Sequence, residues 1–196
     1  MTDIVLFHHI QGLTSGVHDF ADRLRAAGHT VHTPDTFEGR TFASIDEGQA
    51  YCSELGFDKV AARSVELAAD LPASVFAGFS LGAMPAQQLA QTQAGARALL
   101  AYHGFADPAY FDGWPDGVKA QIHAMDHDPF FIGDGEDEEG DIEPAQAFVA
   151  AHSDAELFLY PGSAHLFTDS SLSDYDAGAT ELVLERSLAF LATLEG

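Results

Sequence analysis

The fold is decided by one stretch of the sequence, Val75-Phe76-Ala77-Gly78-Phe79-Ser80-Leu81-Gly82-Ala83. Residues 74–77 predict a buried strand, and residues 81–91 predict a helix that is rich in small side chains. A sharp turn between such elements strains the central serine and leaves no room for side chains at Gly78 and Gly82. The stretch therefore predicts that the Ser80 hydroxyl is an exposed nucleophile at the carboxyl end of a sheet. A structural turn rich in glycine is the alternative interpretation.

Strand-like and helix-like segments alternate along the rest of the chain, which is typical of a mostly parallel sheet covered by helices. We expect an α/β fold with about six mainly parallel strands, formed by a single domain over residues 1–196. The expected strands are Ile4–Phe7, Thr30–His32, Ser74–Ala77, Ala98–Tyr102, Lys119–Met125 and Glu156–Tyr160. The expected helices lie around residues 17–24, 58–70, 81–91, 144–151 and 176–194, and residues 133–141 are expected to form an acidic loop.

A serine nucleophile needs a base, and the base needs an acid that orients it. In folds with this turn, the chain order is serine, then acid, then histidine. His165 follows the last expected strand and is the predicted base; a surface loop histidine is the alternative. Asp128 is the favoured acid because Pro129 would stiffen its position, and Asp126 and Asp134 are the alternatives.

The tetrahedral intermediate of acyl transfer needs two backbone N–H donors for its oxyanion. The N–H of Leu81 directly follows the nucleophile, and the N–H of Ile10 lies in the loop after the first strand. His9 and Gln11 flank Ile10 and are candidates for the substrate pocket. A pair of histidines can also bind a metal, but the chain has no HExxH or similar spacing, so no metal site is predicted.

Trp114 lies in the loop after the fourth expected strand, near Phe105, Tyr110 and Phe111. It is a further candidate for an acyl pocket, and packing beneath the loop is an equally good interpretation. The acidic run 134–141 lacks the alternating ligands of a calcium-binding EF-hand loop and is interpreted as solvated.

The composition excludes several classes of protein. The chain has 31 acidic against 8 basic residues and a formal charge of −23, which repels phosphate backbones and anionic membrane surfaces. We therefore expect neither nucleic-acid nor membrane binding. A single cysteine, Cys52, excludes an internal disulfide. No signal-like or membrane-spanning segment is apparent, so the expected location is cytoplasmic.

The chain resembles the dienelactone hydrolase family of α/β-hydrolases. The resemblance rests on residues 7–13, 26–35, 78–83, 128–130 and 160–167. It implies an α/β-hydrolase fold in which the usual N-terminal antiparallel strands are missing and the nucleophile strand lies near the centre. It also implies Ser80 as nucleophile, Asp128 as acid, His165 as base, and Ile10 and Leu81 as oxyanion donors.

The sequence departs from the family pattern at three positions. Ser80 stands where the family's namesake enzyme has cysteine, and His9 stands where it has glutamate. Asp169 occupies the position of an arginine that holds the substrate carboxylate in that enzyme. Dienelactone is therefore not the expected substrate.

These observations predict a serine hydrolase that cleaves a small carboxylic ester, lactone or thioester through an acyl-enzyme, without a cofactor. Two alternatives come from other classes: a non-catalytic relative that uses the same cleft for binding, and a metal-dependent hydrolase that uses His8 and His9.

Overall fold

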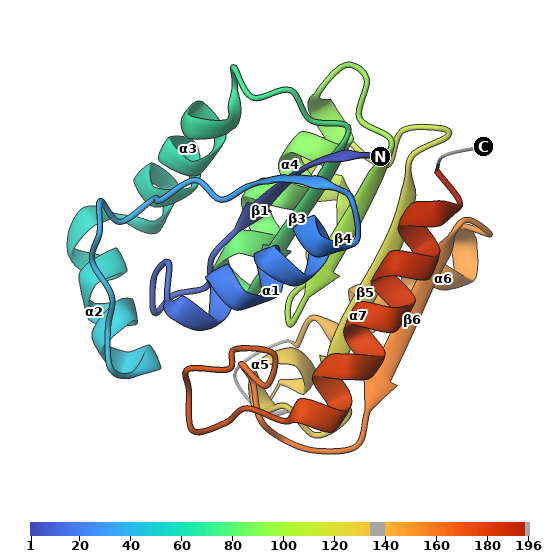
Figure 1. The fold of residues 1–196 in the computed structure, drawn as a ribbon. Helices are drawn as coiled ribbons and strands as arrows, with labels where there is room; N and C mark the ends of the chain where they lie inside the picture. Colours follow the sequence, from blue (N-terminus) through green and yellow to red (C-terminus); the bar gives the residue numbers. More distant parts are fainter. Residues whose placement is uncertain (134–139, 195–196) are drawn as a thin grey trace.

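The computed structural model describes residues 1–133 and 140–194. Its centre is a six-stranded sheet with the strand order β2-β1-β3-β4-β5-β6, in which every pair of neighbours is parallel (Figure 1). The strands are β1 (Asp3–Phe7), β2 (Thr30–His32), β3 (Val75–Phe79), β4 (Ala98–Tyr102), β5 (Lys119–Met125) and β6 (Ala155–Tyr160). β3, which precedes Ser80, is an inner strand of this sheet, as the sequence predicts.

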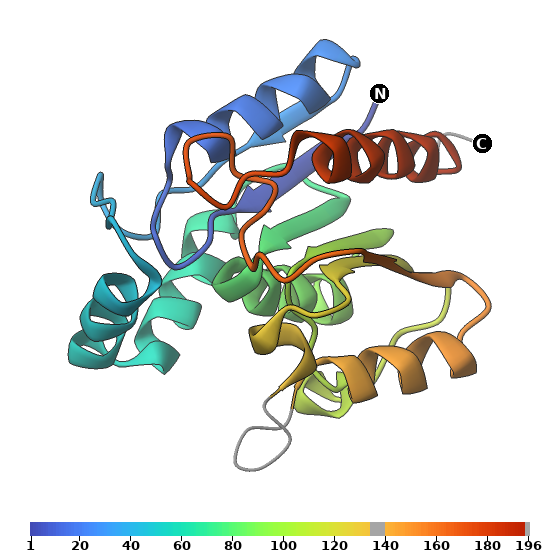
Figure 2. The ribbon, with the colours of Figure 1, turned by 90° about the horizontal axis from the view of Figure 1, so that it is seen from below.

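Helices cover both faces of the sheet. Figure 2 shows α1 (Ser15–Ala26) and α7 (Ala177–Ala192) on one face, and α3 (Phe57–Ala68), α4 (Ala83–Thr92) and α6 (Ile142–Ala151) on the other. α2 (Ile45–Leu55) packs beside α3, and the short α5 (Pro129–Ile132) follows β5. Within the described residues, no helix is long and apolar enough to cross a membrane.

The alternation of side chains along each strand divides the core into two layers. Ile4 and Leu6 of β1 pack in the cluster that includes α1 and α7, whereas Val5 and Phe7 pack in the cluster that includes α4 and α6. Because both faces are covered, β1 and the nucleophile strand read as continuous apolar runs. This arrangement brings the loops after β1, β3, β5 and β6 to one edge of the sheet, where the candidate site lies.

The structure differs from the expected elements at three places. Neither α2 nor α5 was predicted; residues 129–132, which form α5, were assigned to no expected element. The helix expected from Leu81 begins instead as a tight 3-10 turn, Ser80–Gly82, that leads into α4. The expected acidic loop at 133–141 falls largely outside the described residues.

Candidate active site

The backbone at Ser80 is strained. Its φ angle is +49°, in the left-handed region that residues with a side chain rarely adopt. Gly78 and Gly82 must be glycine because backbone atoms occupy the space that a Cβ would need. A Cβ at Gly78 would come within 2.0 Å of the Gly82 carbonyl oxygen, and a Cβ at Gly82 within 2.6 Å of the His8 carbonyl oxygen. The turn therefore has the geometry of a nucleophile elbow, with Ser80 half-buried at the end of β3.

Three of the predicted residues form one chain of hydrogen bonds. The Ser80 hydroxyl lies 2.7 Å from His165 Nε2, and His165 Nδ1 lies 2.6 Å from Asp128 Oδ2. With the proton of the imidazole on Nδ1, the ring donates to Asp128 and accepts from Ser80. The three residues come from the loops after β3, β5 and β6, so the parallel sheet assembles them from distant parts of the chain.

The structure distinguishes among the acid candidates. Asp128 is fully buried, and its other oxygen, Oδ1, accepts the Phe130 N–H at 3.0 Å. Asp126 instead accepts the Gly162 N–H at 3.0 Å and contacts the His127 ring, and these bonds lower the pKa of Asp126. Asp134 lies outside the described residues. Asp128, and not Asp126, is therefore the carboxylate beside His165.

Two aromatic rings that the sequence did not indicate surround the base. The ring centroids of Phe130 and His165 are 4.5 Å apart, and Phe130 is 46% exposed, so it presents an apolar surface beside the base. The ring centroids of His103 and His165 are 6.1 Å apart, and His103 Nε2 lies 2.8 Å from Thr168 Oγ1. Burial lowers the pKa of His103 well below its usual value, so this ring is neutral. Phe130 could have been noticed because it lies two residues after the predicted acid.

Both expected oxyanion donors lie at the site. The Leu81 N–H belongs to the first residues of the 3-10 turn, where N–H groups have no partner within the turn. The Ile10 N–H makes no hydrogen bond to any of residues 1–133 or 140–194. The side chains of Ile10 and Leu81 pack in one apolar cluster with Phe37 and Cys52. The backbone segments that carry the Ile10 and Leu81 N–H groups are therefore anchored by the same apolar cluster.

His8 and His9 use all of their ring nitrogens within the protein. His8 donates from Nδ1 to the His9 carbonyl at 2.8 Å and accepts the Thr36 N–H at 3.1 Å on Nε2. His9 bonds Asp169 at 2.7 Å through Nε2 and accepts the Gln11 N–H at 3.2 Å. Burial lowers the pKa of His8 to about 4. In the described part of the chain, no group of three or more His, Cys, Asp or Glu side chains is arranged to hold a metal.

The sequence suggested three residues for a substrate pocket: His9, Gln11 and Trp114. Each of them makes its polar contacts within the protein. His9 and Gln11 are buried, and the Gln11 side-chain amide donates to the Phe42 carbonyl at 3.0 Å. The Trp114 indole donates to the Val118 carbonyl at 2.8 Å, and its ring packs 4.6 Å from that of Phe148 in the core under α6. Trp114 therefore takes the packing role that was the alternative interpretation.

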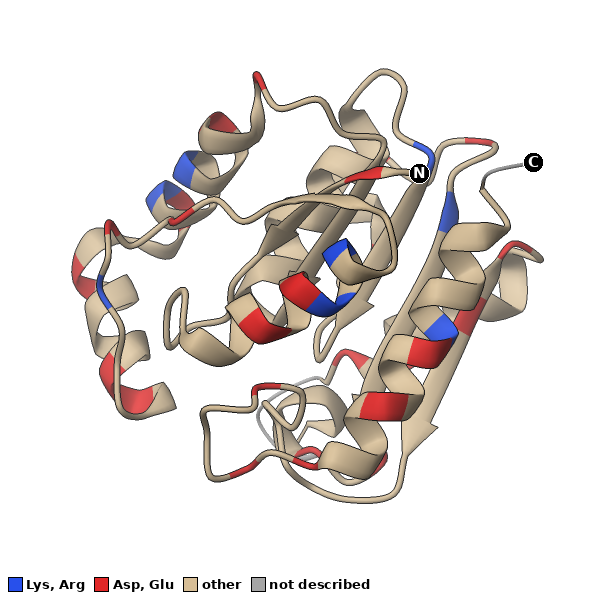
Figure 3. Cartoon of the chain, in the orientation of Figure 1, with Lys and Arg blue, Asp and Glu red and all other residues tan. Residues whose placement is uncertain are grey.

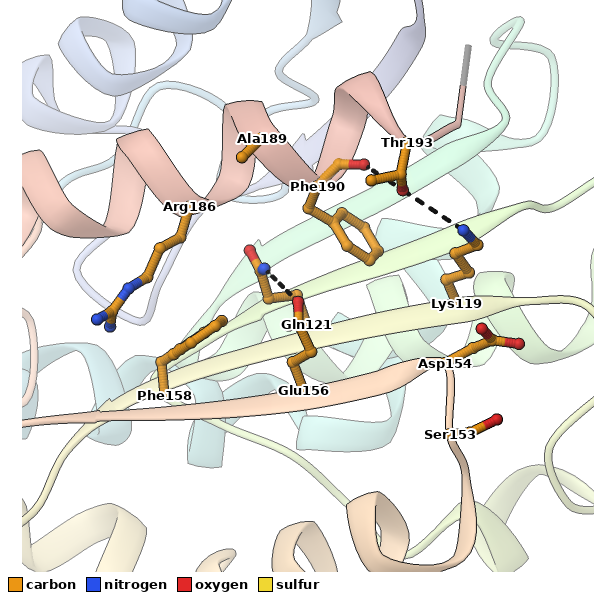
Figure 4. A pocket seen from close by; sticks show the side chains of 10 residues that line it. All are labelled: Lys119, Gln121, Ser153, Asp154, Glu156, Phe158, Arg186, Ala189, Phe190 and Thr193. Carbon is orange, nitrogen blue, oxygen red and sulfur yellow. Dashed lines mark hydrogen bonds between the residues drawn. The ribbon is translucent and has the colours of Figure 1, made fainter. Parts of the chain in front are cut away.

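A cavity of about 390 Å³ lies at the opposite edge of the sheet (Figure 4). It is lined by Lys119, Gln121, Ser153, Asp154, Glu156, Phe158, Arg186, Ala189, Phe190 and Thr193. Arg186 stacks over the Phe158 ring at 4.2 Å, and Gln121 donates to Glu156 at 3.0 Å. Because Lys119 begins β5 and Asp154 precedes β6, this cavity is separate from the triad at the carboxyl ends of the strands.

Comparison with known proteins identifies the family. The model of the dienelactone hydrolase family matches residues 1–195, almost the whole chain. The chain belongs to the dienelactone hydrolase family. As a member of this family, it is a hydrolase that acts on ester bonds. No curated protein matches the chain.

Solved structures show that this family member has the α/β-hydrolase fold. A dienelactone hydrolase-like promiscuous phosphotriesterase from metagenomic libraries is 19% identical with a TM-score of 0.73, covering 99% of this chain and 87% of the other. A Klebsiella pneumoniae protein provisionally assigned as a dienelactone hydrolase is 16% identical with a TM-score of 0.68, covering 98% and 87%. Esterase PE8 is 16% identical with a TM-score of 0.58, covering 98% and 92%.

The loops at the site of this dienelactone hydrolase family member carry negative charge. The loops after β5 and β6 lie at the lower edge of Figure 3, and their described residues 126–133 and 161–176 include acidic side chains but no Lys or Arg. Asp169 is buried and bonded to His9, so the position expected to hold a substrate carboxylate in the family's namesake enzyme is occupied by a carboxylate of the protein itself.

Proposed function

We propose that this chain is a serine esterase that cleaves small, neutral carboxylic esters, lactones or thioesters through an acyl-enzyme on Ser80, within a single domain. The observation that carries the proposal is the continuous hydrogen-bond chain from Ser80 through His165 to Asp128, with links of 2.7 and 2.6 Å. The unbonded Ile10 N–H and the strained elbow support it, because each has a role in acyl transfer and none in packing.

In the first half of the reaction, the Ser80 oxygen attacks the carbonyl carbon while His165 Nε2 takes the hydroxyl proton. The electron pair of the carbonyl moves to its oxygen, which receives hydrogen bonds from the Leu81 and Ile10 N–H groups. Collapse of this intermediate breaks the bond to the alcohol or thiol, which leaves with the proton from His165. Asp128 keeps the imidazole in the correct orientation and stabilises its positive charge.

In the second half, His165 takes a proton from a water molecule, and the resulting hydroxide attacks the acyl carbon. The Ser80 oxygen leaves with the proton from His165, which frees the carboxylic acid. The exposed ring of Phe130 lies beside His165, with ring centroids 4.5 Å apart. It presents an apolar surface for an uncharged acyl or alcohol group.

A fluorophosphonate probe tests the proposal, because it reacts only with an activated serine. We expect stoichiometric labelling of the wild type and of Ser173→Ala, whose exposed serine donates its hydroxyl to Asp174 and has no histidine partner among the described residues, and none of Ser80→Ala. A panel of p-nitrophenyl esters, lactones and acyl thioesters then ranks the substrate classes. Absence of labelling and of hydrolysis in the folded wild type would favour the non-catalytic alternative.

A further inference from the structure

A second buried histidine–carboxylate pair lies beside the triad. His9 Nε2 and Asp169 Oδ2 are 2.7 Å apart, and the two residues are 1% and 2% exposed. His9 follows β1 in the loop that carries Ile10, whereas Asp169 lies four residues after His165 in the loop that follows β6. The pair therefore joins the loop of the oxyanion donor to the loop of the base. The pair takes no direct part in the acyl-transfer steps.

The hydrogen bonds of His9 fix its tautomer and the backbone around Ile10. Nδ1 accepts the Gln11 N–H at 3.2 Å, so the proton lies on Nε2 and is donated to Asp169. The His9 carbonyl accepts the Gly12 N–H at 3.0 Å. The His9 ring and backbone thus hold the N–H groups of residues 11 and 12, and the intervening turn leaves the Ile10 N–H unbonded among the described residues.

Asp169 is held firmly by its own contacts. Oδ2 accepts hydrogen bonds from His9 and from the Thr14 hydroxyl, and Oδ1 accepts from the Ser171 N–H at 2.8 Å and the Ser171 hydroxyl at 2.6 Å. Burial alone would raise the pKa of Asp169, but the hydrogen bonds from His9, Ser171 and Thr14 lower it to about 2. The carboxylate is therefore ionised at neutral pH and has four protein donors, which leaves it no role as a ligand for substrate.

We propose that His9 and Asp169 are positioning residues that set the Ile10 N–H as an oxyanion donor in the esterase reaction. The inference rests on the proposed function. An oxyanion donor acts only if its N–H lies about 3 Å from the developing charge, so a small rotation of the peptide before Ile10 weakens the bond. His9 supplies one end of that peptide, and Asp169 fixes the ring of His9.

The substitution His9→Asn tests the proposal. The shorter amide can still accept the Gln11 N–H in place of Nδ1 but cannot reach Asp169. We expect kcat to fall by about 10- to 100-fold with KM nearly unchanged, because the lost interaction is made only in the transition state. Asp169→Asn removes the charge at the other end and is expected to give a similar loss. His18→Asn, an exposed histidine on α1, is the matched control.

Two further measurements separate positioning from general damage. An aliphatic trifluoromethyl ketone forms a hemiketal with Ser80 whose oxyanion mimics the intermediate, and its affinity should fall by the same factor as kcat. The double variant should lose no more than the larger single loss, since both residues act through one contact. Rates are expressed per active site titrated with fluorophosphonate, so partial unfolding does not alter the comparison.

The proposal is overturned if His9→Asn and Asp169→Asn retain wild-type kcat and ketone affinity per titrated site. It is also overturned if kcat falls while ketone affinity stays unchanged, because the oxyanion donor is then intact. Inactivity of Ser80→Ala alongside either result leaves the proposed function standing. If Ser80→Ala is as active as the wild type, the proposed function itself fails.

Discussion

At the scale of single residues, the site depends on which carboxylate orients His165. Asp126 and Asp128 both follow the end of β5 at Met125, but only the Asp128 side chain is fully buried. Asp128 has one oxygen on the Phe130 N–H and the other on His165. The Oδ1 atom of Asp126 instead accepts the Gly162 N–H and contacts the His127 ring. The two side chains therefore provide a matched comparison within one loop.

We predict that Asp128→Asn reduces kcat by about 10⁴-fold, because an amide favours the wrong tautomer of His165 and does not stabilise the imidazolium. Asp126→Asn keeps an oxygen that can accept the Gly162 N–H and should stay within about tenfold of the wild type. Steady-state kinetics on p-nitrophenyl butyrate measure the loss of kcat in both variants. A larger loss in Asp126→Asn would show that the acid is misassigned.

At the scale of secondary-structure elements, the loops of the site are fixed by helix ends. Asp141 directly precedes α6 and accepts the Phe105 N–H at 2.9 Å, which ties the loop after β4 to that helix. Burial raises the pKa of Asp141 from 3.8 to about 6. Since the folded-state pKa lies above the unfolded value, the folded state binds this proton more tightly. Stability from the bound proton is present below pH 3.8 and is lost as the pH rises through 6.

Replacing Asp141 with asparagine keeps the acceptor for Phe105 and removes the buried charge. We predict that Asp141→Asn raises the melting temperature by about 5 °C at pH 8 and changes it little at about pH 3, where the carboxyl is protonated in both the folded and the unfolded state. Asp70→Asn, at an exposed position, reports the effect of the change in net charge alone. Equal gains at both pH values, or equal gains in the two variants, would contradict the buried-charge account.

The elements also show what the sequence could and could not predict. The inner strands β1, β3 and β4 were predictable because coverage on both faces makes them nearly continuous apolar runs between turn residues. α2 was missed because it buries only Gly48 and Cys52, which leaves no apolar stripe. Its start was nevertheless marked: the Ser44 hydroxyl accepts the Glu47 N–H, and the Glu47 carboxylate accepts the Ala43 N–H, as in a capping box.

The elbow motif at Ser80, the chain order serine, acid, histidine, and Pro129 after Asp128 together predicted that Ser80, Asp128 and His165 would meet, with Asp126 and Asp134 as alternative acids. The contacts of His9 with Asp169 and of Phe130 with His165 were not predictable from residue order. His9 and Asp169 are 160 positions apart, and their contact depends on how two loops lie against each other. That arrangement follows from the packing of the sheet and helices and leaves no local pattern in the sequence.

At the scale of the whole molecule, charge bears on the choice of substrate. The net charge of −23 repels anions on average. Each of the six arginines has a partner within the protein: Arg23 with Glu181, Arg25 with Asp22, Arg63 with Glu38, Arg97 with the Leu194 carbonyl, Arg40 over Tyr51 and Arg186 over Phe158. Binding a substrate carboxylate normally needs such a cation at close range.

We predict that neutral esters are hydrolysed better than matched esters that carry a free carboxylate. For a butyrate ester against its hemisuccinate analogue, kcat/KM should favour the neutral member by about tenfold at low salt, with a smaller preference at high salt as the general repulsion is screened. A preference for the carboxylate-bearing ester at both salt levels would show that a cation reaches the site.

The turnover rate of Ser80→Ala tests the central claim most directly. Wild type, Ser80→Ala and Ser173→Ala are compared on p-nitrophenyl butyrate, with circular dichroism to show that each is folded. The account predicts that Ser80→Ala loses on the order of 10⁶ in kcat, while Ser173→Ala keeps the wild-type rate. A folded Ser80→Ala protein that retains turnover within tenfold of the wild type would contradict the assignment of Ser80 as the nucleophile.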